Sequence, residues 1–284
     1  MAKDALGDRM KSYEQIETTR KALPGLPFCA RLDGRGFSAW TDGLARPYDA
    51  RLQDLMYRLT ALLASEAGAA IGYTQSDEIT LVWTPQPDTQ LFFGGKFQKL
   101  ASVLASTATA HFNRWVQEAI PEKAHLLATF DCRVWTVPSL AEAANVLLWR
   151  ELDATKNSIS MAARAYYSHN ALLNKTGPEM QDMLHERGVN WNNYPEAFKR
   201  GTYVRRRSVT RAFTSDEIEA LPPKHDAHTD PGLVYTRSVS ERLQIPPLGR
   251  VTNRIDVLFN GAEFAETAAD AARASAALHS GVSP

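Results

Sequence analysis

Residues 28–36 read FCARLDGRG and decide how the first half of the chain folds. From 28 to 32 the residues alternate in the manner of a half-buried strand. The glycines that follow Asp33 mark a turn, so this strand ends on a carboxylate. A second acid lies in residues 71–83, IGYTQSDEITLVW, which indicate a β-hairpin with Ser76 and Asp77 at its two-residue tip.

Two helical patterns surround this hairpin. We expect Asp49 to cap a helix in which leucines recur at helical spacing up to Gly68. A second helix follows Gly94-Gly95, and residues 126–137 contain a further strand. The resulting order, β-α-β-β-α-β, predicts an α+β fold with the split βαβ, or ferredoxin-like, topology.

After about residue 140 the pattern becomes mainly helical. Helices are expected over 141–167 and from Gly177 to Gly188, with a late strand at 256–258 and an alanine-rich helix over 262–278. No internal repeat is visible in the chain.

Composition limits the possible classes. The 284 residues include 32 basic and 32 acidic side chains, and 44% are apolar, as in an ordinary globular protein. No apolar run reaches the roughly 18 residues of a membrane span, and the charged N-terminus does not read as a signal peptide. Cys29 and Cys132 cannot form a disulfide framework or a four-cysteine zinc site, so a cytoplasmic setting is expected.

The charge is distributed unevenly. Residues 150–211 carry eleven basic and six acidic groups, a net charge of +5. Within them, residues 191–207 interleave aromatic and basic side chains, which can contact phosphates and stack on unpaired bases. The alternatives to nucleic-acid binding are a solvated helical face, or a structural loop followed by a strand that ends in surface arginines.

Two acids suggest a metal site. In a split βαβ sheet the first strand and the hairpin are neighbours, so Asp33 and Asp77 can reach one point. Mg²⁺ prefers oxygen ligands, and two carboxylates that bridge two ions suit phosphoryl transfer. The Gly34 carbonyl could join them, whereas Glu78 points to the other side of its strand and suits a supporting role. Alternatively, Asp33-Gly34 and Ser76-Asp77 are simply turn residues.

Several polar side chains could contact phosphates near the same edge. Arginine gives bidentate contacts to phosphate oxygens, and cations stabilise the charge that shifts during transfer. The candidates are Arg35, Arg46, Lys96, Lys99 and the hydroxyl of Ser76. Each is otherwise explained as a solvated surface group.

Taken together, the motifs resemble the tRNA(His) guanylyltransferase superfamily. They occur in the family's order, at 7–14 (GDRMKSYE), 31–37 (RLDGRGF), 75–78 (QSDE), 130–133 (FDCR) and 149–154 (WRELDA). Eukaryotic members carry His-Ile-Asn-Asn-Leu-Tyr-Asn where residues 155–161 here read TKNSISM. The chain is therefore more similar to the bacterial and archaeal-type guanylyltransferase-like branch.

The resemblance implies a polymerase-palm-like catalytic domain over residues 1–138 and a C-terminal helical, tRNA-contacting region over 139–284. It implies template-dependent, 3′-to-5′ addition of nucleotides to the 5′ end of tRNA. This would serve either 5′-end repair or G addition to tRNA(His), and the missing histidine favours repair. The chemistry would be two-metal nucleotidyl transfer, in which ATP activates a 5′-monophosphate. The implied cofactors and substrates are two Mg²⁺ ions and ATP, GTP or another nucleoside triphosphate, and the implied partner is tRNA, bound at its 5′ end and acceptor stem. The resemblance also implies a homotetramer in the cytoplasm, with no membrane partner.

The resemblance also assigns roles to residues. Asp33, the Gly34 carbonyl and Asp77 would be metal ligands, and Glu78 matches an acid needed for activity. The remaining assignments are nucleotide contacts: Gly34, Arg35, Gly36, Phe37, Arg46 (in the place of a family lysine), Ser76, Lys96, Lys99 and Asn157.

Two other functions remain open from the residues. A palm-fold nucleotidyl cyclase would use the same two acids but has no role for residues 191–207. A non-catalytic tRNA-binding module would have no need of Asp33 and Asp77.

Overall fold

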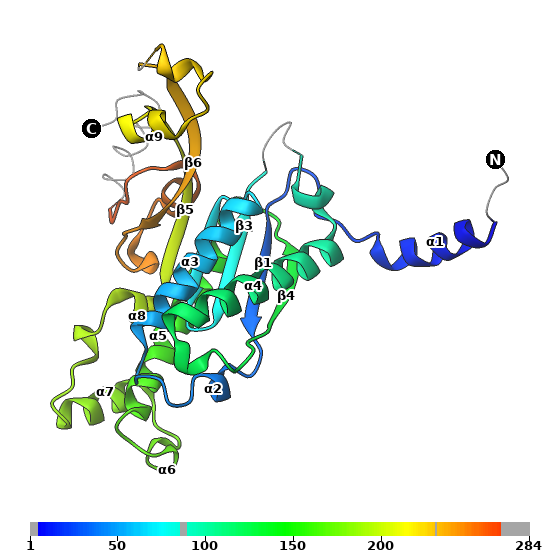
Figure 1. The fold of residues 1–284 in the computed structure, drawn as a ribbon. Helices are drawn as coiled ribbons and strands as arrows, with labels where there is room; N and C mark the ends of the chain where they lie inside the picture. The colour runs from blue at the N-terminus through cyan, green and yellow to red at the C-terminus, as the bar shows by residue number, and fades with distance from the viewer. Residues whose placement is uncertain (1–4, 86–89, 231, 268–284) are drawn as a thin grey trace.

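The computed structural model describes residues 5–85, 90–230 and 232–267 (Figure 1). Within them a six-stranded sheet forms, with strand order β4-β1-β3-β2-β5-β6 and antiparallel pairing throughout. The strands are β1 (Phe28–Gly34), β2 (Ile71–Gln75), β3 (Glu78–Trp83), β4 (Phe130–Thr136), β5 (Thr202–Ala212) and β6 (Val234–Leu243).

The helices connect and cover these strands. The α-helices are α1 (Ala5–Thr18), α2 (Phe37–Trp40), α3 (Ala50–Glu66), α4 (Phe97–Ala119), α5 (Leu140–Arg164), α6 (His169–Leu172), α7 (Gly177–Glu186), α8 (Glu196–Arg200) and α9 (Ser215–Ala220). Short 3₁₀ turns occupy Phe92–Gly95, Pro121–Lys123, Trp191–Asn193, Asp226–His228 and Leu248–Arg250. In the described part of the chain, no helix has both the length and the apolar character that crossing a bilayer requires.

The first four strands and two helices follow the predicted order. β1, α3, β2, β3, α4 and β4 give the strand order β4-β1-β3-β2, which is the split βαβ arrangement. The Asp49 carboxylate accepts the Arg51 N–H at 2.9 Å and so caps α3 as expected. The hairpin tip is also confirmed, because Gln75 pairs with Glu78 across Ser76 and Asp77.

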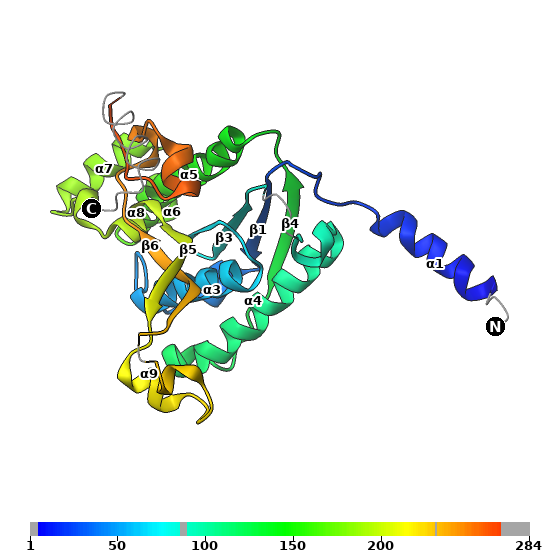
Figure 2. The same ribbon diagram turned by 90° about the horizontal axis from the view of Figure 1, so that it is seen from above.

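Alternation along β1 divides the sheet into two faces. Phe28, Ala30 and Leu32 are buried in the core that contains α3 and α4. Cys29 points the other way, into a second core shared with α5. Figure 2 shows α3 and α4 on one side of the sheet and α5 on the other. Side chains at odd-numbered positions of β1 therefore face the α5 side.

The C-terminal half differs from the mainly helical expectation. Residues 202–243 contain two long strands, and β5 pairs with β2, so the sheet extends past residue 138. The sequence of β5, TYVRRRSVTRA, has β-branched and aromatic residues suited to a strand. A strand that ends in surface arginines was one alternative for residues 191–207, and β5 confirms it and continues to Ala212.

Two smaller expectations also change. Residues Asp256–Asn260 form a π-helical turn instead of a late strand, and the Val257 N–H donates to the Asn253 carbonyl at 3.1 Å. Most of the expected helix over 262–278 lies outside the described residues, and residues 262–267 are not helical.

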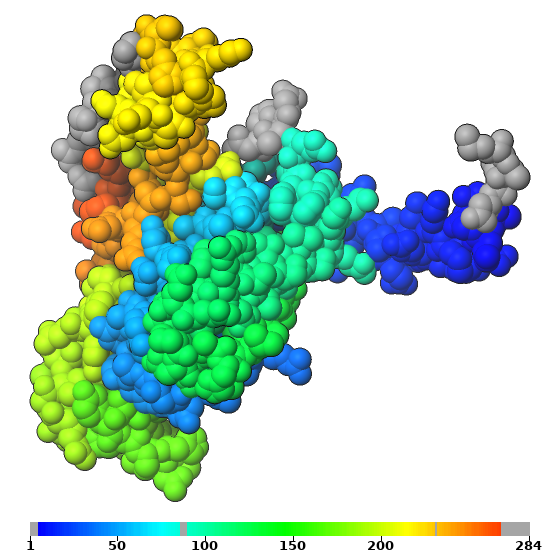
Figure 3. All heavy atoms as spheres, viewed as in Figure 1, coloured from blue at the N-terminus to red at the C-terminus, as the bar shows by residue number. Residues whose placement is uncertain are grey.

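Helix α1 was not expected and projects from the body of the molecule (Figures 1 and 3). None of its residues is buried. Leu6, Met10, Tyr13 and Ile16 are 46–69% exposed. They recur at three- and four-residue spacing, so α1 carries an apolar stripe without a partner in the described chain.

Replacing Gly34 with alanine should destabilise the fold. A Cβ at this position would lie 2.3 Å from the Phe37 ring, and that ring is buried against Trp40, Phe112 and Phe130. Overpacking of this kind costs about 1–3 kcal/mol, which urea denaturation can measure. Gly177→Ala is the matched control, since its Cβ would meet nothing closer than 4.0 Å. Equal stability of the two variants would contradict the prediction.

Candidate active site

The ends of β1 and the hairpin tip meet at one edge of the sheet. Asp33 is the Cα partner of Glu78, and the Gly34 N–H donates to the Asp77 carbonyl at 3.2 Å. Both Asp33 and Asp77 are half-buried. Among the described residues neither carboxylate forms an ion pair with a basic side chain. The structure therefore brings the two acids together and leaves their charge unneutralised.

The surroundings of Asp77 make its charge costly. Burial raises its pKa above the usual range, and the negative charge of Asp33 raises it further, while a hydrogen bond from Ser76 acts in the opposite direction. A bound cation would offset both the cost of burying the Asp77 charge and its repulsion by Asp33. In residues 5–85, 90–230 and 232–267, no three acidic, histidine or cysteine side chains converge on one point that could hold a metal ion. An ion at this edge would need further oxygens, such as a backbone carbonyl or a phosphate.

Glu78 is held by Arg150 of α5. Arg150 Nε lies 2.5 Å from one carboxylate oxygen of Glu78, and Nη2 donates to the other at 2.7 Å. Nη2 also contacts Asp153 at 3.1 Å, and Asn157 Nδ2 lies 3.4 Å from the same Asp153 oxygen. Burial raises the pKa of Glu78, and the Arg150 charge partly offsets this. Glu78 and Asn157 thus belong to one network beside the acid pair.

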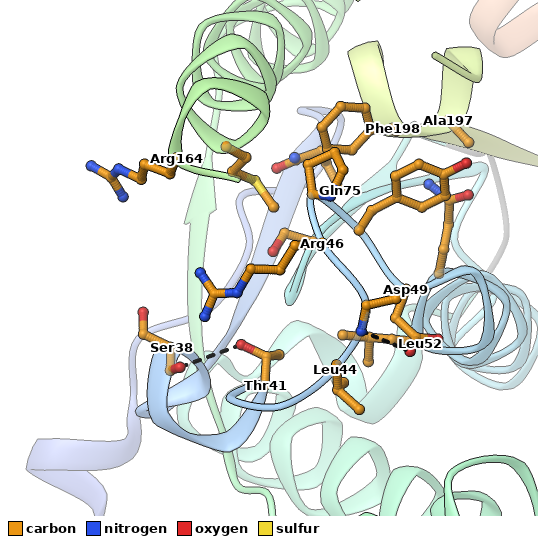
Figure 4. A pocket seen from close by; sticks show the side chains of 16 residues that line it. Ser38, Thr41, Leu44, Arg46, Asp49, Leu52, Gln75, Arg164, Ala197 and Phe198 are labelled. Atoms are coloured by element: carbon orange, nitrogen blue, oxygen red, sulfur yellow. Dashed lines mark hydrogen bonds between the residues drawn. The ribbon is translucent and has the colours of Figure 1, made fainter. Parts of the chain in front are cut away.

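A hollow of about 250 Å³ opens beside the hairpin tip (Figure 4). The Arg46 side chain extends across it, Arg164 lies on one side, and Phe198 lies at its edge. Tyr48 stacks on Phe198 with ring centroids 5.0 Å apart. Polar groups include Asp49, Gln53, Gln75 and Ser76. The hollow therefore combines an aromatic wall, amide groups and two arginines, and it extends to Ser76, the residue next to Asp77.

Three residues of the Gly34–Phe37 turn have different surroundings. Arg35 is exposed, and its N–H donates to the Thr129 carbonyl at 2.9 Å. Gly36 precedes α2 with φ 68°, a left-handed conformation that suits glycine. The Phe37 ring is buried in the core, so only its backbone could approach a ligand.

Lys96 and Lys99 are not brought to the acid pair within this chain. They line a separate hollow with Glu14 and Thr18 of α1. The start of α4 is tied to residues 20–22 by the hydrogen bonds Phe97 N–H to Arg20 and Ala22 N–H to Gly95. This places both lysines near the start of β1, whereas Asp33 lies at its end, about 17 Å along the strand.

Sequence reasoning missed the aromatic wall and one face of α5. Met161 and Arg164 line the hollow, and with Asn157 they follow helical i, i+4, i+7 spacing. That spacing could have indicated them once Asn157 was a candidate. Tyr48 and Phe198 lie far apart in the sequence and carry no local signal.

Much of the aromatic and basic segment 191–207 has structural partners. Trp191 Nε1 donates to Ser158 at 3.2 Å, and Lys199 Nζ donates to the Asn192 carbonyl at 2.8 Å. Arg205 and Arg207 both pair with Glu241. The structural alternative therefore accounts for these four side chains. Arg206, which is half-buried, forms no ion pair with a described residue.

A split βαβ sheet with two unneutralised acids beside an arginine-lined hollow has the features of an enzyme that transfers nucleotides. Residues 7–138 match the family described as tRNA(His) guanylyltransferase. The solved structure of a bacterial tRNA(His) guanylyltransferase (Thg1)-like protein in complex with ATP is 41% identical, with TM-score 0.67, over 72% of this chain and 87% of that one.

A bacterial Thg1-like protein in complex with GTP is 34% identical, with TM-score 0.66, over 87% of this chain and 94% of that one. The tRNA(His) guanylyltransferase of Neurospora crassa is 29% identical over 235 residues, 75% of this chain and 79% of the relative. The chain belongs to the tRNA(His) guanylyltransferase family, in its Thg1-like branch, and is a nucleotidyltransferase. The resemblance seen in the sequence is thereby confirmed.

Proposed function

We propose that this protein adds nucleotides to the 5′ end of tRNA in the 3′-to-5′ direction, with the opposite strand of the acceptor stem as template. The observation that carries the proposal is the hydrogen bond from Gly34 to Asp77. It holds two acids from β1 and the hairpin together beside a hollow suited to a nucleotide. Membership of the Thg1-like branch, with relatives in complex with ATP and GTP, supports the same activity.

The hollow would hold the nucleoside triphosphate. Its base would lie against Tyr48, which is backed by the buried ring of Phe198 and offers an aromatic face for stacking. Arg46 and Ser76 would contact the phosphates, because the side chain of Arg46 crosses the hollow and Ser76 adjoins Asp77. Arg46 replaces a family lysine and keeps the charge while offering a planar set of donors.

The acid pair fits magnesium. Asp33 and Asp77 are half-buried carboxylates without a basic partner among the described residues, and Mg²⁺ usually binds one or two carboxylates plus phosphate oxygens. Asp33, Asp77 and the Gly34 carbonyl would hold it. When bound, such ions activate an attacking hydroxyl and neutralise a leaving group. Glu78, fixed by Arg150, would orient this edge of the sheet.

The order of the steps is the one that the family resemblance implies. An oxygen of the tRNA 5′-monophosphate would first attack the α-phosphate of ATP and release pyrophosphate. The 3′-hydroxyl of the incoming nucleotide would then attack the 5′-phosphate of that adenylylated end and release AMP. A palm-like role for the sheet and a homotetramer are part of the proposal. The apolar stripe of α1, which has no partner in the described chain, supports self-association.

A tRNA that lacks its first nucleotide tests the proposal. The protein should add the nucleotide that pairs with the opposing base in clear preference to the other three. The measurement is incorporation of each of the four labelled nucleotides opposite each of the four bases. Addition of guanosine whatever the opposing base would overturn templating, and no addition to any substrate would overturn the function.

A further inference from the structure

Helix α5 presents a tryptophan to solvent beside the acid pair. All six tryptophans of the chain lie in the described part, and Trp149 is the one that is exposed, at 50%. Leu152, three residues further along α5, is 52% exposed as well, so the two side chains form one apolar patch. A ring of this size gains much free energy when a flat partner covers it, which makes the patch a candidate contact surface.

The sheet face next to Trp149 is only partly covered. α5 lies toward β3 and β5 (Figure 2), and its Arg150 pairs with Glu78 of β3. Over β4 the described residues leave the same face open, because the Arg133 side chain there is 58% exposed. Trp149 reaches toward this open part, since the guanidinium of Arg31 on β1 lies 5.8 Å from its ring centre. The ring therefore borders the open face over β1 and β4.

Two cations hold the Trp149 ring in place. The guanidinium groups of Arg31 and Arg150 both lie within cation–π range, and the Arg150 group is 4.6 Å from the ring centre. Because Arg150 is bound to Glu78, the ring is tied to the strand that follows Asp77. Arg31 lies one same-face step, or about 7 Å along the strand, from the first acid of the pair. A fixed aromatic surface thus lies close to the acid pair.

Trp149 is too far from the nucleotide hollow to contact a base bound there. The α5 residues that line the hollow, Met161 and Arg164, are twelve and fifteen positions further along the helix. At 1.5 Å per residue this is about 18–22 Å. The hollow reaches the acid pair from Ser76 at the hairpin tip, whereas Trp149 lies on the β1 side. The substrate that meets Trp149 is therefore the RNA, which approaches over the open face.

An aromatic surface suits one part of such an RNA in particular. A stem that lacks its first nucleotide has an unpaired base opposite the gap, and this base is the template. Bases stack on aromatic rings through their faces, and such stacking hardly distinguishes one base from another. The pairing edge stays free for the incoming nucleotide. A tryptophan can therefore order any template base without reading its identity, as repair of different RNA ends requires.

From this we infer that Trp149 stacks on the unpaired template base of the RNA and orders it beside the acid pair. The inference rests on the proposed function, because it assigns a contact to the RNA substrate of the same site. It makes Trp149 a residue that positions the template, with Leu152 widening the apolar surface.

The fluorescent base 2-aminopurine, placed at the template position, tests the stacking without turnover. Its emission falls when it stacks on an aromatic ring, and the binding titration is run on an acceptor-stem minihelix that lacks its first nucleotide, with a chelator and without nucleotide. Wild type should quench the probe. Trp149→Leu should lose the quenching and bind about tenfold more weakly, the scale of one base stacked on an aromatic side chain. Trp149→Phe keeps an aromatic face and should retain most of both.

Phe264→Leu is the matched control. Phe264 is similarly exposed, at 47%, but it lies beside Leu243 of β6, at the other edge of the sheet from β4. This variant should quench the probe and bind the minihelix as wild type does. A minihelix with a complete first pair has no unpaired template base, so Trp149→Leu should weaken its binding much less. Equal weakening for the two minihelices, or full quenching by Trp149→Leu, would overturn the inference.

Light scattering separates a template contact from a protein interface. The oligomeric state of Trp149→Leu should equal that of wild type. A changed oligomeric state with unchanged quenching would assign the apolar patch to contacts between protein chains and overturn the inference. If wild type quenches the probe and Trp149→Leu does not, yet wild type adds no nucleotide to any RNA, the proposed function fails while the stacking contact stands.

Discussion

Replacing Asp77 with asparagine should lower nucleotide addition by about a hundredfold or more, the scale seen when one charge-stabilising group is lost from an active site. Asparagine preserves the size of the side chain but removes the charge that would hold a cation with Asp33. The measurement is the initial rate of nucleotide incorporation into a tRNA that lacks its first residue. Asp54→Asn, an exposed acid on α3, is the control and should keep the wild-type rate. A variant that retained more than a tenth of that rate would exclude Asp77 from the reaction.

The same substitution should stabilise the protein when divalent ions are absent. The folded-state pKa of Asp77 is raised, so its contribution to stability is present at low pH and is lost as the pH rises through that pKa. At neutral pH the charged side chain is therefore unfavourable, and asparagine removes this cost. The gain over wild type should shrink as the pH falls toward the ordinary aspartate value of 3.8.

When Mg²⁺ is present, wild type should become more stable than Asp77→Asn. A ligand that binds only the folded state raises stability by mass action, and wild type has the stronger site. Urea unfolding of both proteins, at neutral pH with and without Mg²⁺, gives the comparison. If Mg²⁺ stabilises wild type and Asp77→Asn equally, Asp77 does not hold the ion.

The sequence identified the parts of the site that depend on local pattern. Alternation along 28–32 and the polar tip at 76–77 were enough to predict β1, the hairpin and their contact, because the split βαβ topology makes them neighbours. Asp33 and Asp77 could be paired for that reason. The Asp49 cap of α3 was equally local, since a capping side chain bonds to the backbone two residues later.

Contacts between distant segments could not be predicted in the same way. Glu78 and Arg150 are 72 residues apart, and only the packing of α5 on the sheet brings them together. The aromatic wall joins Tyr48 to Phe198 of α8, and both pack against α5 in a separate cluster. The strand at β5 was only one of several alternatives, because its arginines equally suggested contacts with nucleic acid, whereas Glu241 of β6 neutralises two of them across the strand pair. In each case the determining partner comes from another element.

Replacing Arg150 with methionine should lower the free energy of unfolding by about 3–5 kcal/mol, the usual cost of leaving a buried partner charged and unpaired. The side chains of Arg150 and Glu78 are only 10% and 16% exposed, so water cannot replace the lost contact. Glu78 already has a raised pKa, and loss of the arginine charge should raise it further. The defect should therefore be largest at neutral pH and diminish as the pH falls toward the ordinary glutamate value of 4.5.

A double variant distinguishes charge from packing. Arg150→Met combined with Glu78→Gln removes both charges, so it should recover most of the stability that Arg150→Met loses at neutral pH. Arg207→Met is the matched surface control. Its side chain is 54% exposed and pairs with Glu241 at 2.6 Å, so its loss should cost no more than about 1 kcal/mol. If the single and double Arg150 variants are equally unstable in urea, the contacts of Arg150 with Trp149 and Asp153, and not its pairing with Glu78, are what stabilise this edge of the sheet.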